Sequence, residues 1–161
     1  MASASDHPTT ASGPARFAVP AARILLGLVF TVFGLNGFLH FIPQPPIPGV
    51  AGELLGAMAA TGYFFPVLKG LEVAAGLMLL SGRLVPLALV LLAPVIVQIA
   101  LFHFVLTPGQ VGMAIGLLAL ELFLAWAYRD SFRGVLAVHA RPRLVAGDGA
   151  GARAPRQAAA T

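Results

Sequence analysis

PVLKGLEVAAGLMLLSGRLVP, residues 66–86, is the stretch that decides the fold of this 161-residue chain. It is apolar enough to cross a lipid bilayer, yet it carries Lys69 and Glu72 in its first half and Arg83 near its end. On a helix, Lys69 and Glu72 lie three residues apart on one face, so they can form an ion pair. Ionisable groups at membrane depth are costly unless they face protein or water. The segment therefore predicts a membrane-spanning helix whose charged face looks into a helical bundle.

The composition of the whole chain also indicates a membrane protein. Hydrophobic residues make up 58% of the sequence and charged residues only 10%, whereas a soluble domain carries about 25% charged residues. Four long apolar blocks leave room for one small bundle and no second domain. The net charge of +4 does not indicate a nucleic-acid partner, because the arginines do not cluster on one amphipathic face. The absence of cysteine excludes disulfides, CxxC thiol relays, thiolate zinc sites and cysteine-ligated iron–sulfur clusters.

Prolines and short turns divide the apolar sequence into four predicted transmembrane helices. A helix rises ~1.5 Å per residue, so about 20 residues cross the hydrocarbon core of a bilayer. The run AGELLGAMAATGY (51–63) is too short to cross, and we expect a short interfacial helix there. The predicted fold class is all-α, an integral membrane four-helix bundle with helices at about 22–42, 66–82, 84–106 and 110–128. The bundle domain covers residues 16–139, between polar tails at 1–15 and 140–161 that we expect to be disordered.

The distribution of arginine predicts the orientation in the membrane. With four crossings, the arginines all fall on one side, and only Lys69 lies toward the other. The positive-inside rule then places both termini and the 81–83 turn in the cytoplasm, with the 43–65 loop outside. The expected location is a bacterial cytoplasmic (inner) membrane.

Polar residues of all four helices converge in the outer half of the predicted bundle. Taking ~1.5 Å per residue, three of them lie roughly 9–12 Å from the outer end, and Glu121 about 16 Å. These residues are the candidate ligand-binding set: Asn36, His40, Lys69, Glu72, Gln98, His103 and Glu121.

Each candidate also has a structural interpretation. Lys69 can extend to the interface with Glu72 as its partner. Asn36 and Gln98 can form interhelical hydrogen bonds, and no metal or haem motif accompanies His40 and His103. Glu121 differs, because a carboxyl at mid-depth needs either a partner, such as Gln98 or Asn36, or neutralisation by a proton. No motif of a hydrolase or nucleotide-binding protein is present, and no catalytic residue is assigned.

Two motifs stand out in the sequence: ARILLGLVFTVFGLNGF at 22–38 and PxxKGLExxxGLxLLxGRxxPLA at 66–88. Together they resemble the DoxX/DoxD-like membrane proteins. The resemblance covers roughly residues 22–128 and implies a four-helix membrane fold of bacteria and archaea. The family takes its name from a subunit associated with a terminal quinol oxidase, and some members are linked to thiol or oxidative-stress systems. Many members carry a lysine soon after the glycine corresponding to Gly34, where this chain has Asn36 and Gly37.

Three functions remain open from the sequence. The leading hypothesis is an accessory protein or subunit of respiratory or redox machinery, with a pocket for a quinone-like or other amphiphilic molecule. In this hypothesis, Lys69 orients a polar head group of the ligand, and Glu72 or Glu121 accepts or donates a proton. The second is a non-catalytic membrane scaffold or assembly factor. The third, a pathway for protons or small solutes, requires a homo-oligomer, because one four-helix bundle has little room for a pore.

Overall fold

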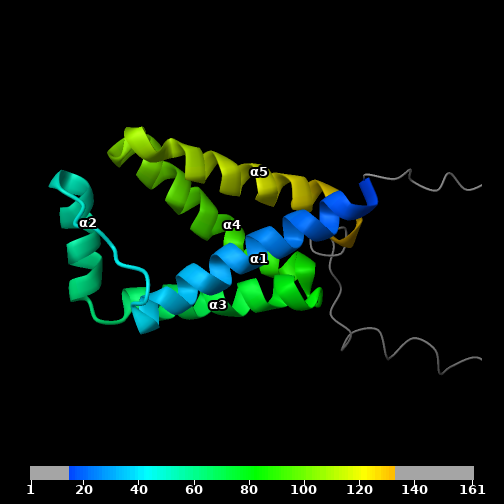
Figure 1. The fold of residues 1–161 in the computed structure, drawn as a ribbon, viewed down its shortest axis with the longest axis horizontal. Coiled ribbons are helices and arrows are strands. Elements are labelled where there is room, and N and C mark those ends of the chain that lie inside the picture. The colour runs from blue at the N-terminus through cyan, green and yellow to red at the C-terminus, as the bar shows by residue number, and fades with distance from the viewer. Residues whose placement is uncertain (1–14, 133–161) are drawn as a thin grey trace, which may run out of the picture. The chain divides into compact units, whose positions relative to one another are not determined.

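The computed structural model describes residues 15–132, and in these residues every regular element is a helix (Figure 1). One compact unit ends at Arg129, and a second begins at Asp130, where only the end of a 3-10 turn, η3 (Arg129–Phe132), is described. The described part of the first unit contains five α-helices, a π-helical turn and a 3-10 turn. They are α1 (Ala15–Leu39), α2 (Gly49–Ala60), α3 (Phe64–Ser81), α4 (Val85–Leu101), η1 (Phe102–Leu106), η2 (Pro108–Gln110) and α5 (Val111–Ala127).

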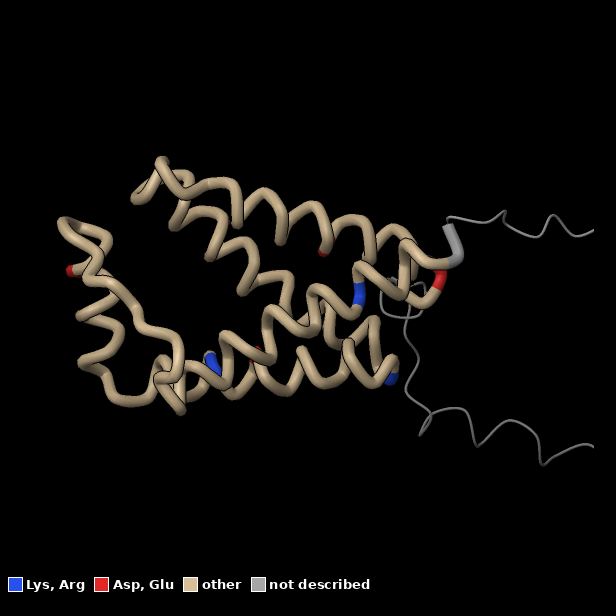
Figure 2. The backbone as a smooth tube through the Cα atoms, in the orientation of Figure 1, with Lys and Arg blue, Asp and Glu red and all other residues tan. Residues whose placement is uncertain are grey.

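Four helical segments of the described chain are long and apolar enough to cross a membrane, which confirms the predicted all-α membrane bundle. They are Phe17–Leu39, Phe64–Ser81, Val85–Leu106 and Pro108–Ala127. Each presents large apolar side chains on its surface, among them Phe33, Leu77, Val97 and Leu122. Figure 2 shows how sparsely charged residues occur along these helices. The chain is therefore a multi-pass membrane protein with lipid as its surroundings.

The ends of the first helix differ from the predicted 22–42. α1 begins at Ala15, because Pro20 is accommodated inside the helix rather than preceding it. It ends at Leu39, because His40 adopts a left-handed conformation with φ of 52°. The His40 amide still donates to the Asn36 carbonyl at 2.9 Å, which closes the last turn.

The other predicted boundaries shift by smaller amounts. The helix predicted at 66–82 begins at Phe64, whose amide donates to the Thr61 hydroxyl at 3.2 Å, and it ends before Gly82, which has φ of 70°. The helix predicted at 84–106 changes to π geometry after Leu101. The helix predicted at 110–128 is α-helical over 111–127. The tails predicted as disordered lie outside the described residues, apart from Ala15.

Small residues bring α1 and α3 into the closest packing of the bundle (Figure 1). A Cβ atom built on Gly34 of α1 would lie 2.8 Å from Val73 Cγ2 on α3. A Cβ atom on Gly76 of α3 would lie 2.8 Å from the backbone nitrogen of Thr31 and 2.9 Å from the Gly27 carbonyl oxygen. Only glycine allows the two backbones to approach this closely.

α4 packs against α3 and α5, and α1 packs against the same two helices, so the four spans form a closed ring of neighbours. The largest fully buried side chains come from all four spans: Leu26, Leu79, Leu89, Leu92, Ile96 and Leu124. α2 lies across one end of this group, transverse to α1 and α3 (Figure 1). Glycines in left-handed conformation bracket it, Gly49 with φ of 71° and Gly62 with φ of 73°.

Candidate functional site: a cleft between α2, α3 and α4

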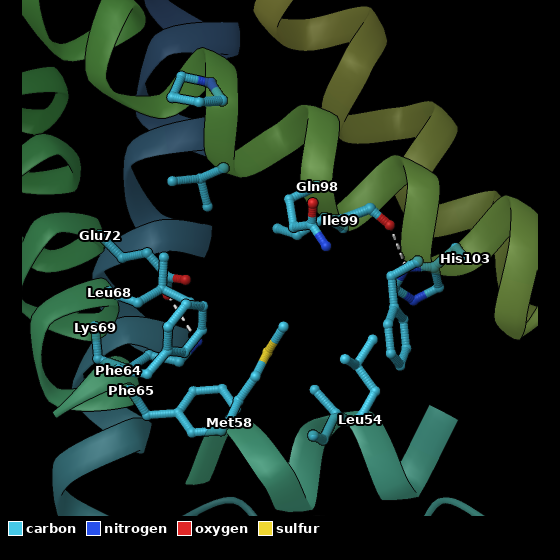
Figure 3. Close-up of a pocket in the computed structure, with 14 residues that line it drawn as sticks. Leu54, Met58, Phe64, Phe65, Leu68, Lys69, Glu72, Gln98, Ile99 and His103 are labelled. Carbon is cyan, nitrogen blue, oxygen red and sulfur yellow. Dashed lines mark hydrogen bonds and ion pairs between the residues drawn. The ribbon is translucent and has the colours of Figure 1, made fainter. Parts of the chain in front are cut away.

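A cavity of about 390 Å³ opens between α2, the first half of α3 and the end of α4 (Figure 3). α2 contributes one wall, α3 a second, and α4 with η1 the third. The lining residues are Leu54, Leu55, Met58, Phe64, Phe65, Leu68, Lys69, Glu72, Pro94, Val95, Gln98, Ile99, Phe102 and His103. We call this cavity the cleft. Four of the seven sequence candidates line it: Lys69, Glu72, Gln98 and His103.

Lys69 and Glu72 form the polar part of the α3 wall. The Lys69 Nζ donates to Glu72 Oε2 at 2.8 Å, which confirms the ion pair predicted from their spacing. Glu72 is almost completely buried, whereas Lys69 is half-buried. The stem of Lys69 crosses Gly37 of α1, where an added Cβ would overlap its methylenes. Gly37 therefore makes room for the lysine to bend toward its partner.

Gln98 and His103 stand on the opposite wall, on the α4 side (Figure 3). The Gln98 amide has no hydrogen-bond partner among the described residues and is exposed in the cleft. His103 belongs to η1, and its Nδ1 lies 2.8 Å from the Ile99 carbonyl oxygen. Polar side chains thus lie on two opposite walls of the cavity.

The remaining lining is apolar or aromatic. Figure 3 shows Leu54 and Met58 reaching from α2 into the space between the two polar walls. Phe64 and Phe65 pack edge to face, with ring centroids 5.5 Å apart, at the end of the cavity where α3 begins. A mostly apolar cavity with a few convergent polar groups is typical of a site for a small amphiphilic molecule.

Asn36 and His40 lie at the end of α1, where they help to terminate the helix, and they do not line the cleft. The Asn36 side chain makes two hydrogen bonds with one residue, accepting from the Ile42 amide at 2.6 Å and donating to the Ile42 carbonyl at 3.2 Å. It therefore holds the chain that leaves α1. His40 is exposed at the left-handed position that ends the helix.

Glu121 lies away from the cleft on α5, where it is buried with 7% of its surface exposed. Its Oε2 is buried without a hydrogen-bond partner in the described chain. The partners expected from the sequence, Gln98 and Asn36, do not reach it. A place in the same half of the predicted bundle therefore does not put Glu121 in the same site as Glu72.

The sequence did not predict that α2 forms a wall of the cleft, or that the aromatic pair at the start of α3 lines it. The helical spacing of Leu54, Leu55 and Met58 was a signal, but it indicated an interfacial helix rather than one that covers a cavity. The π-helical turn that carries His103 has no sequence signal that we recognise. Within residues 15–132, no three His, Asp or Glu side chains come together as metal ligands.

No protein-family model, curated protein or solved structure matches this chain. The cleft is therefore the feature of this chain that bears on its function.

Proposed function

We propose that the protein binds an amphiphilic small molecule, such as a quinone-like compound, in the cleft, as an accessory component of membrane redox machinery. The observation that carries this proposal is the ion pair Lys69–Glu72 in the wall of an otherwise largely apolar cavity. A buried pair adds little stability compared with apolar packing. Its position in a cavity therefore favours a role in binding.

The two kinds of lining suit the two ends of an amphiphile. A polar head group would take hydrogen bonds from the Lys69 ammonium and the Gln98 amide. Its apolar portion would contact Leu54, Met58 and Phe65, where each buried CH₂ contributes about 0.8 kcal/mol. Glu72 is the carboxylate that stands next to the head group, so it is also the residue that would exchange a proton there. Glu121 has no part in this proposal, because it lies outside the cleft.

The proposed orientation follows from charge. The first half of α1 and the turn between α3 and α4 lie at the end of the bundle opposite α2 (Figure 1), and these segments contain Arg23 and Arg83. The positive-inside rule would assign that end to the cytoplasm. Both termini would then be cytoplasmic and the cleft would face the outer side of a bacterial inner membrane. The link to redox machinery rests on the resemblance of residues 22–38 and 66–88 to DoxX-like proteins.

Binding of decyl-benzoquinone to the purified protein in mild detergent tests the proposal. We expect saturable binding by isothermal titration and a rise in the unfolding temperature. Met58→Trp should fill the cleft and weaken binding at least tenfold. The matched control is Leu122→Trp on the exposed surface of α5, where Leu122 is 65% exposed, and it should leave binding unchanged.

Equal affinity in the two tryptophan variants would contradict the proposal, because binding would then not depend on the cleft. Glu72→Gln separates the proposal from a scaffold role. A scaffold predicts that only the abundance of the variant in the membrane falls, whereas a binding site predicts that the affinity of the folded variant changes as well.

A further inference from the structure

The hydrogen bond of His103 fixes which of its ring nitrogens carries a proton. Nδ1 lies 2.8 Å from the Ile99 carbonyl oxygen. A carbonyl oxygen can only accept, so the proton of this bond must belong to Nδ1. In the neutral imidazole, Nε2 then carries a lone pair and acts as an acceptor.

The surroundings of His103 hold the ring in this orientation. η1 has π geometry, in which the Thr107 amide reaches the Phe102 carbonyl five residues back at 3.2 Å. The imidazole also packs edge to face on the neighbouring Phe102 ring, with centroids 5.6 Å apart and planes at 70°. A π-helical turn is uncommon and often occurs at functional sites. Here it presents His103 to the cleft.

Nε2 of His103 is an acceptor without a partner in the described chain. The other polar groups that face the cleft are Lys69, Glu72 and Gln98. Lys69 already donates to Glu72 on the opposite wall, and no hydrogen bond joins Gln98 to the imidazole. A polar atom in a mostly apolar cavity is costly unless something pairs with it. Water can donate to Nε2 in an empty cleft, and a ligand with a donor group can take the place of that water.

We propose that the cleft selects an amphiphile whose head group carries a hydroxyl, which donates its hydrogen bond to His103 Nε2. This inference rests on the proposed function, because it concerns the ligand of the same cleft. A quinone-like ring in its oxidised form offers only carbonyl acceptors to Nε2, whereas a phenol or the reduced dihydroxy form offers a donor. His103 therefore determines specificity for the hydroxylated form.

Two probes that differ by one methyl group test this selection. Para-nonylphenol can donate from its oxygen, and para-nonylanisole cannot. We expect the phenol to bind the full-length protein about tenfold more tightly, which corresponds to about 1.4 kcal/mol, within the range of one hydrogen bond. His103→Phe should abolish this preference and leave both probes with the affinity of the anisole. Equal affinity of the two probes for the unsubstituted protein would overturn the inference.

Nitrogen NMR of histidine-labelled protein tests the proton position without any ligand. The signals of His103 are assigned by their loss in His103→Phe, and we expect a protonated Nδ1 and an unprotonated Nε2. A protonated Nε2 in the neutral ring would overturn the inference even if both probes bind.

The two proposals fail in different ways. If both probes bind equally and Met58→Trp blocks both, the cleft binds amphiphiles without the proposed selection, so only the inference is wrong. If neither probe nor decyl-benzoquinone binds, the proposed function is wrong and the inference falls with it.

Discussion

The Lys69 ammonium and the Glu72 carboxylate lie 2.8 Å apart, but they differ in their access to the surface: the lysine side chain is 24% exposed and the glutamate side chain 4%. Loss of one partner therefore has unequal consequences. A lysine without its glutamate can extend along the cleft, whereas a glutamate without its lysine stays buried.

We expect Lys69→Met to destabilise the protein more than Glu72→Gln. Breaking a buried pair from one side costs about 3–5 kcal/mol, and we place Lys69→Met in this range and Glu72→Gln below it. Denaturant unfolding in mixed micelles measures both. The double variant should recover part of the loss, because it leaves no unpaired charge. A larger loss for Glu72→Gln would contradict the asymmetry.

A single methyl group on Gly76 should disrupt the bundle, whereas one on Gly70 of the same helix should not. A Cβ on Gly76 meets the backbone of α1, which cannot move aside locally, and a Cβ on Gly70 meets nothing within 4 Å. We expect Gly76→Ala to cost about 2 kcal/mol or more. Gly70→Ala should be neutral or stabilise by up to about 1 kcal/mol through helix propensity. Unfolding temperature and monodispersity in detergent distinguish the two variants, and equal behaviour would refute the close packing of α1 and α3.

Asn36 and His40 should respond to substitution as structural residues at the end of α1. Asn36→Ala removes both hydrogen bonds to Ile42 and should destabilise by about 1–3 kcal/mol. His40→Gly relieves a left-handed conformation and should stabilise by up to about 1 kcal/mol. Both variants should keep the affinity for decyl-benzoquinone within about twofold once folded, as measured by titration. A large loss of affinity in either would show that the cleft extends to α1.

Glu121→Leu should stabilise the protein. The carboxyl is buried and its Oε2 has no partner in the described chain, and an unsatisfied buried polar group costs about 1–3 kcal/mol. Leucine removes this cost in an apolar setting, and Glu121→Gln serves as the polar control that should not gain stability. The unfolding midpoints of the two variants, compared with that of the unsubstituted protein, test this prediction. A stable Glu121→Leu protein with normal binding would also show that the glutamate is not part of the cleft.

The sequence predicted those features that depend on neighbours along the chain. Long apolar blocks predicted the four spans, and a spacing of three residues predicted the ion pair of Lys69 and Glu72. The number of residues from a turn predicted depth but not the direction a side chain faces. For this reason Asn36 and Glu121 were expected together with Glu72, although each lies in different surroundings.

Features that depend on contacts between distant segments could not be predicted. The docking of α2 over the start of α3 and the end of α4 is set by tertiary packing, and so is the cavity between them. The change from α to π geometry after Leu101 leaves the hydrophobic pattern unaltered, so no periodicity reveals it. The tautomer of His103 follows from its hydrogen bond to the Ile99 carbonyl, and only the three-dimensional structure shows this bond.

The glycines at the two ends of α2 have a mechanical consequence. At Gly49 and Gly62 an added Cβ would meet nothing, so space does not require glycine there, but left-handed backbone favours it. α2 is thus a short helix with a glycine at each end that can act as a hinge, and it forms one wall of the cleft. Rotation about Gly49 and Gly62 would move α2 and widen the cleft while α1, α3, α4 and α5 kept their packing. A ligand would then enter and leave without any rearrangement of the four membrane-spanning helices.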